Sequence, residues 1–376
     1  MRQTFRRSED FARHEPMLVV CAVVALISML FMPPDAEYLS YIDFRVLCLL
    51  FSLMAVVLGF QECGFFRALA HKLLSGEKQL RLLSLILVLL PFFASMVVTN
   101  DVSLITFVPF TILVLSMVDQ KELLIRIVVL QTMAANLGSM ATPVGSPHDL
   151  YLYEYYKLSA GEFFKLMLPL TGVSLAGLSV AALCTKTEPL KVRFEEEVRL
   201  HKPKKFTLYT ALFILCLLSV FRVLPYLAVT AFVFIAMLLV SPKLLRNVDY
   251  SLLLTFVCFF IFAGNMGRIP DVRGFLSGLL EKNTLLTAIL SCQLISNVPA
   301  SVLLSGFTQD WRALLLGTNI GGLGTPIASL ASLISLRLYL RSEGAKPVRY
   351  LAVFTLANAG GIFLLLAAVR LFHIGG

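Results

Sequence analysis

Charged residues are scarce in this chain. They make up 15% of its 376 residues, against about 25% in an average soluble protein. The seven cysteines form no CxxC pair and have no His-rich neighbours, which argues against a disulfide framework or a zinc site. The sequence also lacks a Walker motif, a nucleophile elbow, an HExxH motif and a dinucleotide fingerprint. It therefore gives no support to an enzyme, to a bound cofactor or to ATP-driven transport by this chain alone.

Apolar residues, in contrast, are abundant and lie in long runs. They form 58% of the chain, and the runs approach the roughly 20 residues that a helix needs to cross a bilayer. The runs do not alternate with period two, so helices rather than a β-barrel are expected. The first run, 17–32, is followed by Pro33-Pro34-Asp35 without a small-residue cleavage site, and we interpret it as a retained span. The composition predicts an all-α integral membrane protein with about nine to eleven transmembrane helices.

One motif occurs twice. The segment 136–144 recurs without a gap as 319–327, and each copy follows a shorter echo, Thr99-Asn100 or Ser296-Asn297. Polar, helix-breaking sequence at membrane depth is tolerated where it lines a cavity or is buried in protein. Matching interruptions in two halves of a chain are typical of the binding site of a transporter. The matched positions are Asn136 with Asn319, Gly138 with Gly321, Thr142 with Thr325 and Pro143 with Pro326.

The two motifs divide the chain into halves that we interpret as inverted repeats. With the N-terminus in the cytoplasm, most of the 32 Lys and Arg residues fall in loops on the inner side, as the positive-inside rule expects. The same rule accounts for the net charge of +9 without a nucleic-acid partner.

The predicted organisation begins with a cytoplasmic N-terminus at 1–16. The first repeat, 17–184, contains a re-entrant hairpin at 80–118 and a broken helix at 122–148. A cytoplasmic linker and connecting span follow at 185–223. The second repeat, 224–372, contains a hairpin at 284–308 and a broken helix at 311–336.

Asp101 is the strongest candidate for ion coupling. It follows Thr99-Asn100 at the tip of the first hairpin. A carboxylate at the bilayer centre costs at least ~2.5–3.5 kcal/mol, which makes it rare without a partner or a function. Asp101 could carry a proton or face Na⁺, because hard cations prefer oxygen ligands. Alternatively, it could cap the returning helix.

The hairpin tips and broken helices supply the other candidates. The side chains of Asn100 and Asn297 can donate and accept hydrogen bonds, and we expect them to face a cavity; the alternative is turn formation. In the broken helices, glycine and proline interrupt the backbone hydrogen bonds. The released carbonyls could bind a cation, and the helix N-termini could bind an anion. The alternative is that these residues form ordinary kinks. The predicted substrate- or ion-binding residues are Thr99, Asn100, Asp101, Asn136, Gly138, Thr142, Pro143, Gly145, Ser146, Ser296, Asn297, Asn319, Gly321, Gly322, Thr325, Pro326 and Ser329.

His148 and Asp149 distinguish the first copy from the second, which we align here with Ala328-Ser329. A His–Asp pair could relay protons or help to select substrate. It could equally be a hydrated pair near the outer surface. Arg45 lies near the end of a span, where snorkelling of a long side chain explains it.

These residues resemble the motifs of the ion transporter superfamily, which holds arsenite permeases, citrate-type carriers and NhaD-type sodium–proton antiporters. Thr99-Asn100-Asp101 resembles its Asn-Asp hairpin motif, and 136–147 resembles its Asn-x-Gly-x-x-x-Thr-Pro-x-Gly-x-Pro stretch. The segments 296–300 and 319–330 resemble the counterparts in the second half. The resemblance implies a homodimer in which a scaffold domain holds a mobile domain of hairpins and broken helices.

The resemblance also implies ion-coupled transport by alternating access in a multi-pass protein of the cell membrane. Our leading hypothesis is a carrier of a small anion or oxyanion coupled to H⁺ or Na⁺. Few basic residues lie at the predicted midplane, so neutral oxyacids such as arsenite also fit. A cation–proton antiporter that uses Asp101 is the second hypothesis, and a channel or membrane enzyme is the third.

Overall fold

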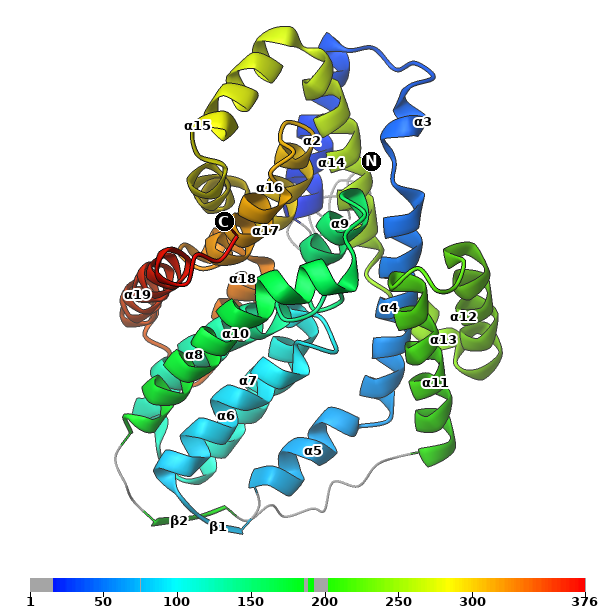
Figure 1. Cartoon of the computed structure of the whole chain (residues 1–376). Coiled ribbons are helices and arrows are strands. Elements are labelled where there is room, and N and C mark those ends of the chain that lie inside the picture. The colour runs from blue at the N-terminus through cyan, green and yellow to red at the C-terminus, as the bar shows by residue number, and fades with distance from the viewer. Residues whose placement is uncertain (1–15, 75, 186–188, 193–201, 376) are drawn as a thin grey trace, which may run out of the picture.

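The computed structural model describes residues 16–74, 76–185, 189–192 and 202–375, and this part of the chain is almost entirely helical (Figure 1). Most of the predicted cytoplasmic N-terminus and part of the charged linker lie outside the described residues. By length and composition, six helical segments in the described part could cross a membrane. The prediction of an all-α integral membrane protein is confirmed, and the total number of spans stays a prediction. The six segments are 44–62, 100–117, 160–183, 203–220, 242–268 and 347–371.

One side of the molecule consists of α2 (Pro16–Phe31), α3 (Tyr38–Tyr41), α4 (Phe44–Glu62), α11 (Pro203–Val220), α12 (Tyr226–Val240), α13 (Pro242–Leu245) and α14 (Tyr250–Arg268) (Figure 1). We call this set the α4 side. Helices α11 and α12 pack against α4, and α2 packs against α14. The two central helices begin alike, because Asp43 caps α4 by accepting from the Val46 N–H at 3.0 Å and Asp249 caps α14 by accepting from the Leu252 N–H at 2.9 Å.

The first predicted hairpin and broken helix are both present as interrupted helices. The segment comprises α5 (Phe65–Leu74), β1 (Gly76–Gln79), α6 (Leu80–Ala94), α7 (Asn100–Met117), the 3₁₀ turn η1 (Lys121–Leu123), α8 (Leu124–Ser139), α9 (Pro147–Tyr155) and α10 (Ala160–Leu183). Helices α6 and α7 meet at the Thr99-Asn100 tip, and α8 and α9 flank the first motif. A capping box at Ser159 starts α10, since its Oγ accepts from the Glu162 N–H and the Glu162 carboxylate accepts from the Ser159 N–H.

The second half contains the corresponding elements. They are α15 (Pro270–Ile295), α16 (Asn297–Ser305), α17 (Trp311–Gly321), the 3₁₀ turn η2 (Pro326–Ala328), α18 (Leu330–Leu340) and α19 (Pro347–Leu371). The backbone of α15 is interrupted at Asn283, where φ is −165°, so a surface stretch is separated from the arm that enters the hairpin. With nine residues, α16 spans only about 14 Å, which is too short for a hydrocarbon core of about 30 Å.

The hairpins and broken helices pack reciprocally. Helix α6 lies on α8 and α15 lies on α17, so the first arm of each hairpin contacts the broken helix of its own half. The second arms contact the broken helices of both halves, because α7 packs on α8 and α18, and α16 packs on α17 and α9. Two repeats related by a two-fold axis would produce this pattern. The inverted relation of the repeats and their boundaries stay predictions.

Two local features differ from the sequence-based expectation. The broken helices extend to Tyr155 and Leu340, because the polar motifs lie in their middles and each is followed by a further helical stretch. In addition, β1 pairs antiparallel with β2 (Pro189–Val192), with Gly76 opposite Val192. Four-residue strands show too little alternation to be recognised in a sequence.

Candidate functional site

The first break, 140–146, is held close to the first hairpin. Gly138 permits this approach, because a Cβ there would overlap the Phe92 carbonyl oxygen of α6. The Thr142 hydroxyl donates to the Met96 carbonyl at 2.6 Å, and the Asn100 N–H donates to the Gly145 carbonyl at 3.2 Å. Two predicted residues of this break therefore bind the hairpin, Thr142 through its hydroxyl and Gly145 through its backbone carbonyl.

The second break is held by Gln293, which sequence analysis missed. Its Nε2 donates to the carbonyls of Gly321 at 2.8 Å and Leu323 at 3.0 Å, and its Oε1 accepts from the Thr325 N–H at 2.8 Å. Gly324 has φ +109°, and a Cβ there would overlap the Gln293 Oε1. The available signal was an amide within an apolar hairpin arm, three residues before Ser296.

Asn136 joins the two halves. Its Oδ1 accepts from the Asn100 Nδ2 at 2.9 Å and from the Ser329 hydroxyl at 3.1 Å. Its Nδ2 lies 3.5 Å from both the Gly322 carbonyl and the Ser332 hydroxyl. The tip of the first hairpin, the first broken helix and the second broken helix thus meet at one amide.

Asn319 makes the reciprocal connection. Its Nδ2 donates to Asp149 Oδ1 at 2.6 Å, and Asp149 Oδ2 accepts from the Ser146 hydroxyl at 2.6 Å. The correspondence corrects the alignment of the repeats. The gap-free offset that pairs Asn136 with Asn319 also pairs Asp149 with Ser332 and His148 with Ala331, rather than with Ala328-Ser329. The contact of Asn136 with Ser332 matches that of Asn319 with Asp149.

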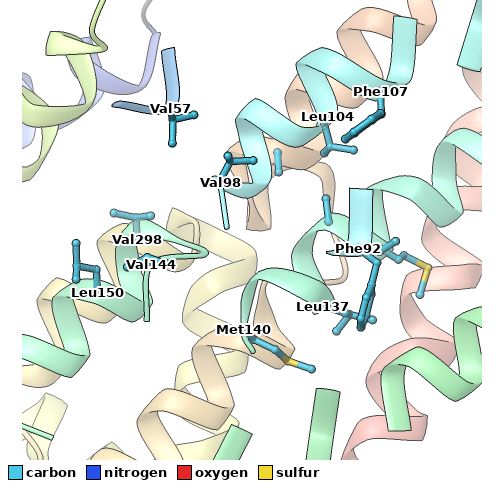
Figure 2. Close-up of a cluster of buried hydrophobic side chains, with 14 of the residues drawn as sticks. Val57, Phe92, Val98, Leu104, Phe107, Leu137, Met140, Val144, Leu150 and Val298 are labelled. Atoms are coloured by element: carbon cyan, nitrogen blue, oxygen red, sulfur yellow. The ribbon is translucent and has the colours of Figure 1, made fainter. Parts of the chain in front are cut away.

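The hairpin tips are embedded in apolar packing. Figure 2 shows Val98 of the first tip and Val298 of the second near Val144 of the first break, within a larger buried cluster. Asn100 and Asn297 are each only 5% exposed. The expectation that these asparagines face a cavity stays a prediction. Neither is among the residues that line the cavity described below; the Asn100 amide donates to Asn136, and Asn297 accepts from the Ser296 hydroxyl.

A cavity of about 1180 Å³ lies between this polar cluster and the α4 side. Among the described residues, only two of the predicted binding residues line the cavity, Thr99 and Asp101. Val144 and Pro147 of the first break also line it. Its other walls include Leu53 and Val57 of α4, Val20 of α2 and Phe259 of α14. Ile295, Ile327 and Leu330 close it from the second half.

Three charged side chains line this cavity: Asp101, Asp249 and Arg337. Asp101 lies in the first turn of α7, and its Oδ1 is buried without a hydrogen-bond partner among the described residues. Asp249 instead uses Oδ1 to cap α14. The cap of α7 falls on Thr99, whose side chain makes no capping bond. A buried carboxylate oxygen without a partner favours an ionic or protonic role for Asp101 over a capping role.

A buried ion cluster lies at the C-terminal end of α9, away from the His148 and Asp149 end. The Glu154 side chain is 2% exposed, and its Oε2 lies 2.8 Å from Arg45 Nε and 3.4 Å from Arg222 Nη2. Arg222 also donates to the carbonyls of Tyr153 and Leu158. Arg45 thus forms a specific ion pair that joins α4 to Glu154 of α9, so snorkelling does not account for its position.

We expect Gly138→Ala to destabilise the protein by at least about 1–3 kcal/mol, because the new methyl group would overlap the backbone of α6. Detergent-solubilised protein should melt at a clearly lower temperature. Gly161→Ala, in the first turn of α10, is the matched control, because a methyl group added there would have no atom within 4 Å. Equal melting temperatures of the two variants would contradict the close approach of α6 and α8.

Comparisons with known proteins agree with this architecture. The family model described as a citrate transporter matches residues 10–310, which include both hairpins and the first broken helix. An uncharacterized transporter of Methanocaldococcus jannaschii is 29% identical over 359 residues, covering 95% of this chain and 98% of the relative. The inner membrane protein YbiR of Escherichia coli is 30% identical over 302 residues, covering 79% and 80%. The chain is therefore a multi-pass membrane transport protein and belongs to the citrate transporter family.

Proposed function

We propose that the protein is a secondary active transporter that moves a small anion or oxyanion, coupled to H⁺ or Na⁺, by alternating access. One observation carries the proposal: a single cavity contacts both hairpins and both broken helices on one side and α2, α4 and α14 on the other. A solute in this cavity would touch both groups of helices. Movement of one group against the other would then change the side from which the solute is reached.

The proposed binding site has a wall and a support. Thr99 and Asp101 belong to the wall, together with apolar side chains. Asn100, Asn136, Asn297 and Asn319 lie behind it and fix the shapes of the tips and breaks. The remaining predicted residues belong to this support: Gly138, Thr142, Pro143, Gly145, Ser146, Ser296, Gly321, Gly322, Thr325, Pro326 and Ser329.

The carrier hypothesis is tested with purified protein in proteoliposomes. Uptake of labelled citrate, phosphate and arsenite is measured with an imposed H⁺ gradient, an imposed Na⁺ gradient or neither. A carrier should accumulate one of these solutes above its external concentration only when the coupling gradient is present. Uptake that ignores both gradients would contradict coupled transport and indicate a channel.

A cation–proton antiporter is the second candidate, and the charges of the cavity favour it. Among the described residues, the cavity is lined by two carboxylates, Asp101 and Asp249, and by one guanidinium, Arg337. An anionic substrate would need more positive charge than this wall offers, unless it enters with a cation or a proton. Sodium-dependent proton movement without any of the three solutes would select this candidate.

We further propose that the protein lies in a cell membrane as a homodimer, with its N-terminus in the cytoplasm. In a cysteine-free background, single cysteines at Gly76, Lys204 and Ser342 should then react with an impermeant reagent only from the cytoplasm. Cysteines at the exposed Tyr155 and Gln309 should react only from outside. Labelling of Gly76 and Ser342 from opposite sides would contradict the inverted repeats.

A further inference from the structure

His148 and Asp149 form an enclosed pair in the first turn of α9. Their exposed fractions are 2% and 0%. The preceding Pro147 and the nearby Val144 line the cavity, whereas neither His148 nor Asp149 is among its lining residues. The pair therefore lies directly behind the cavity wall, where the first broken helix meets α17 of the second, and it is not the hydrated surface pair considered above.

The contacts of the pair leave one atom without a partner. Asp149 accepts from the Ser146 hydroxyl at Oδ2 and from Asn319 Nδ2 at Oδ1, each at 2.6 Å. His148 Nδ1 lies 2.9 Å from the same Ser146 hydroxyl. His148 Nε2 is buried without a hydrogen bond among the described residues, and it lies 3.5 Å from Asp149 Oδ1.

Other charged groups lie away from the pair. The helices packed on α9 are α4, α16 and α17, and side chains of α14 and α10 also contact its tyrosines. The charged residues of these two helices lie near their ends, with Arg268 at the end of α14 and Glu162 and Lys165 near the start of α10. Helix α16 has no charged residue, α17 has only Arg312 near its start, and α4 carries Arg45 and Glu62 near its two ends. Within α9 the other charged residue is Glu154, which is paired with Arg45 and Arg222. Among the described residues, the one ion pair of Asp149 is with His148 at 3.5 Å, so His148 or an added proton can balance the charge of Asp149.

The hydrogen atoms can be counted. The Ser146 hydroxyl has one hydrogen, and the short contact with Asp149 uses it. His148 must then donate to Ser146 from Nδ1. In neutral histidine this tautomer leaves Nε2 as an acceptor, which faces a carboxylate oxygen and leaves one negative charge buried. One added proton, on Nε2 or on the carboxyl group, supplies the missing hydrogen between Nε2 and Oδ1 and removes the net charge.

We propose that His148 and Asp149 together bind one proton that is taken up and released during the transport cycle. The inference rests on the proposed function and assigns a coupling site separate from Asp101. Water supplies the proton, which forms an N–H bond at Nε2 or an O–H bond at Oδ1, and its release breaks that same bond and returns the proton to water. Asn319 links the charge of the pair to the second broken helix, since its amide donates both to Asp149 and to the Leu315 carbonyl.

The first test measures coupling with citrate as the probe. In proteoliposomes, His148→Gln and Asp149→Asn should still exchange labelled citrate between equal internal and external concentrations. The pH gradient that stops net citrate flux should shift, because each variant would move one proton fewer per citrate. Tyr151→Phe, on the same helix, is the control and should retain the parental value. An unchanged value in both variants, or loss of exchange in variants that elute as folded protein, would overturn the proposal.

The second test needs no substrate, so it can be carried out even if the parent moves no citrate. Absence of citrate transport would contradict the proposed function and would leave the bound proton to be decided by this second test. Unfolding by SDS in mixed micelles is followed against pH for the parent and for His148→Gln/Asp149→Asn. In an unfolded chain, His and Asp have lost their protons above about pH 7. If the folded pair keeps one, the parent should lose stability relative to the double variant as pH rises, by about tenfold in the unfolding equilibrium per pH unit. Identical pH slopes would contradict a bound proton.

Discussion

Asp101→Asn should abolish accumulation of substrate against a gradient while substrate exchange survives. The substitution preserves the size of the side chain and removes its charge, at a position where one carboxylate oxygen is buried without a partner in the described structure. A neutral amide can neither titrate nor balance a cation. Coupling free energies of ~1–3 kcal/mol correspond to factors of about 5 to 150, so the accumulation ratio should fall by at least about fivefold. If H⁺ is the coupling ion, the pH dependence of transport should also flatten.

Asp249→Asn is the matched control for this experiment. Asp249 lines the same cavity, but its Oδ1 already caps α14. Asparagine caps helices about as well as aspartate, so this variant should keep both its stability and its coupling. If Asp101→Asn accumulates substrate like the parent at every pH, Asp101 has no coupling role, and His148 with Asp149 becomes the remaining coupling site.

The second large effect is expected for Asn136→Ala. This change removes the amide that connects the Asn100 tip with Ser329 and with the Gly322 backbone of the other half. Transport should be lost, because the two breaks and the first hairpin tip would no longer hold one arrangement. The loss of stability should be modest, about 1–3 kcal/mol, as for other buried polar groups left without partners.

Gln131→Ala separates these two effects. Gln131 lies on the same helix and donates to the Leu87 carbonyl and the Thr111 hydroxyl, both at 2.7 Å. Its loss should reduce the melting temperature to a similar extent, while transport per folded molecule persists. If both variants transport equally well at matched amounts of folded protein, Asn136 has only a structural role.

Much of the architecture could be predicted from local sequence. Apolar runs identified the helices, and the repeated Asn-Gly-Thr-Pro pattern located both breaks, because glycine and proline act on the backbone of their own segment. The same locality limited the interpretation of side chains. Arg45 and Glu154 are far apart in the chain, and only folding shows that they form a buried pair. Gln293 was missed for the same reason, since its backbone partners at Gly321, Leu323 and Thr325 belong to the second break, beyond α16.

The sequence by itself determined that this is a helical membrane protein with two matching polar interruptions, since hydrophobicity and helix breaking are properties of short segments. The tertiary structure decided which polar residues reach the cavity. Asp101 reaches it, whereas Asn100 and Asn297 are enclosed and Asn319 turns to Asp149. These outcomes depend on how the two halves pack against each other, and side-chain direction at such an interface is set by long-range packing that neighbouring residues do not encode.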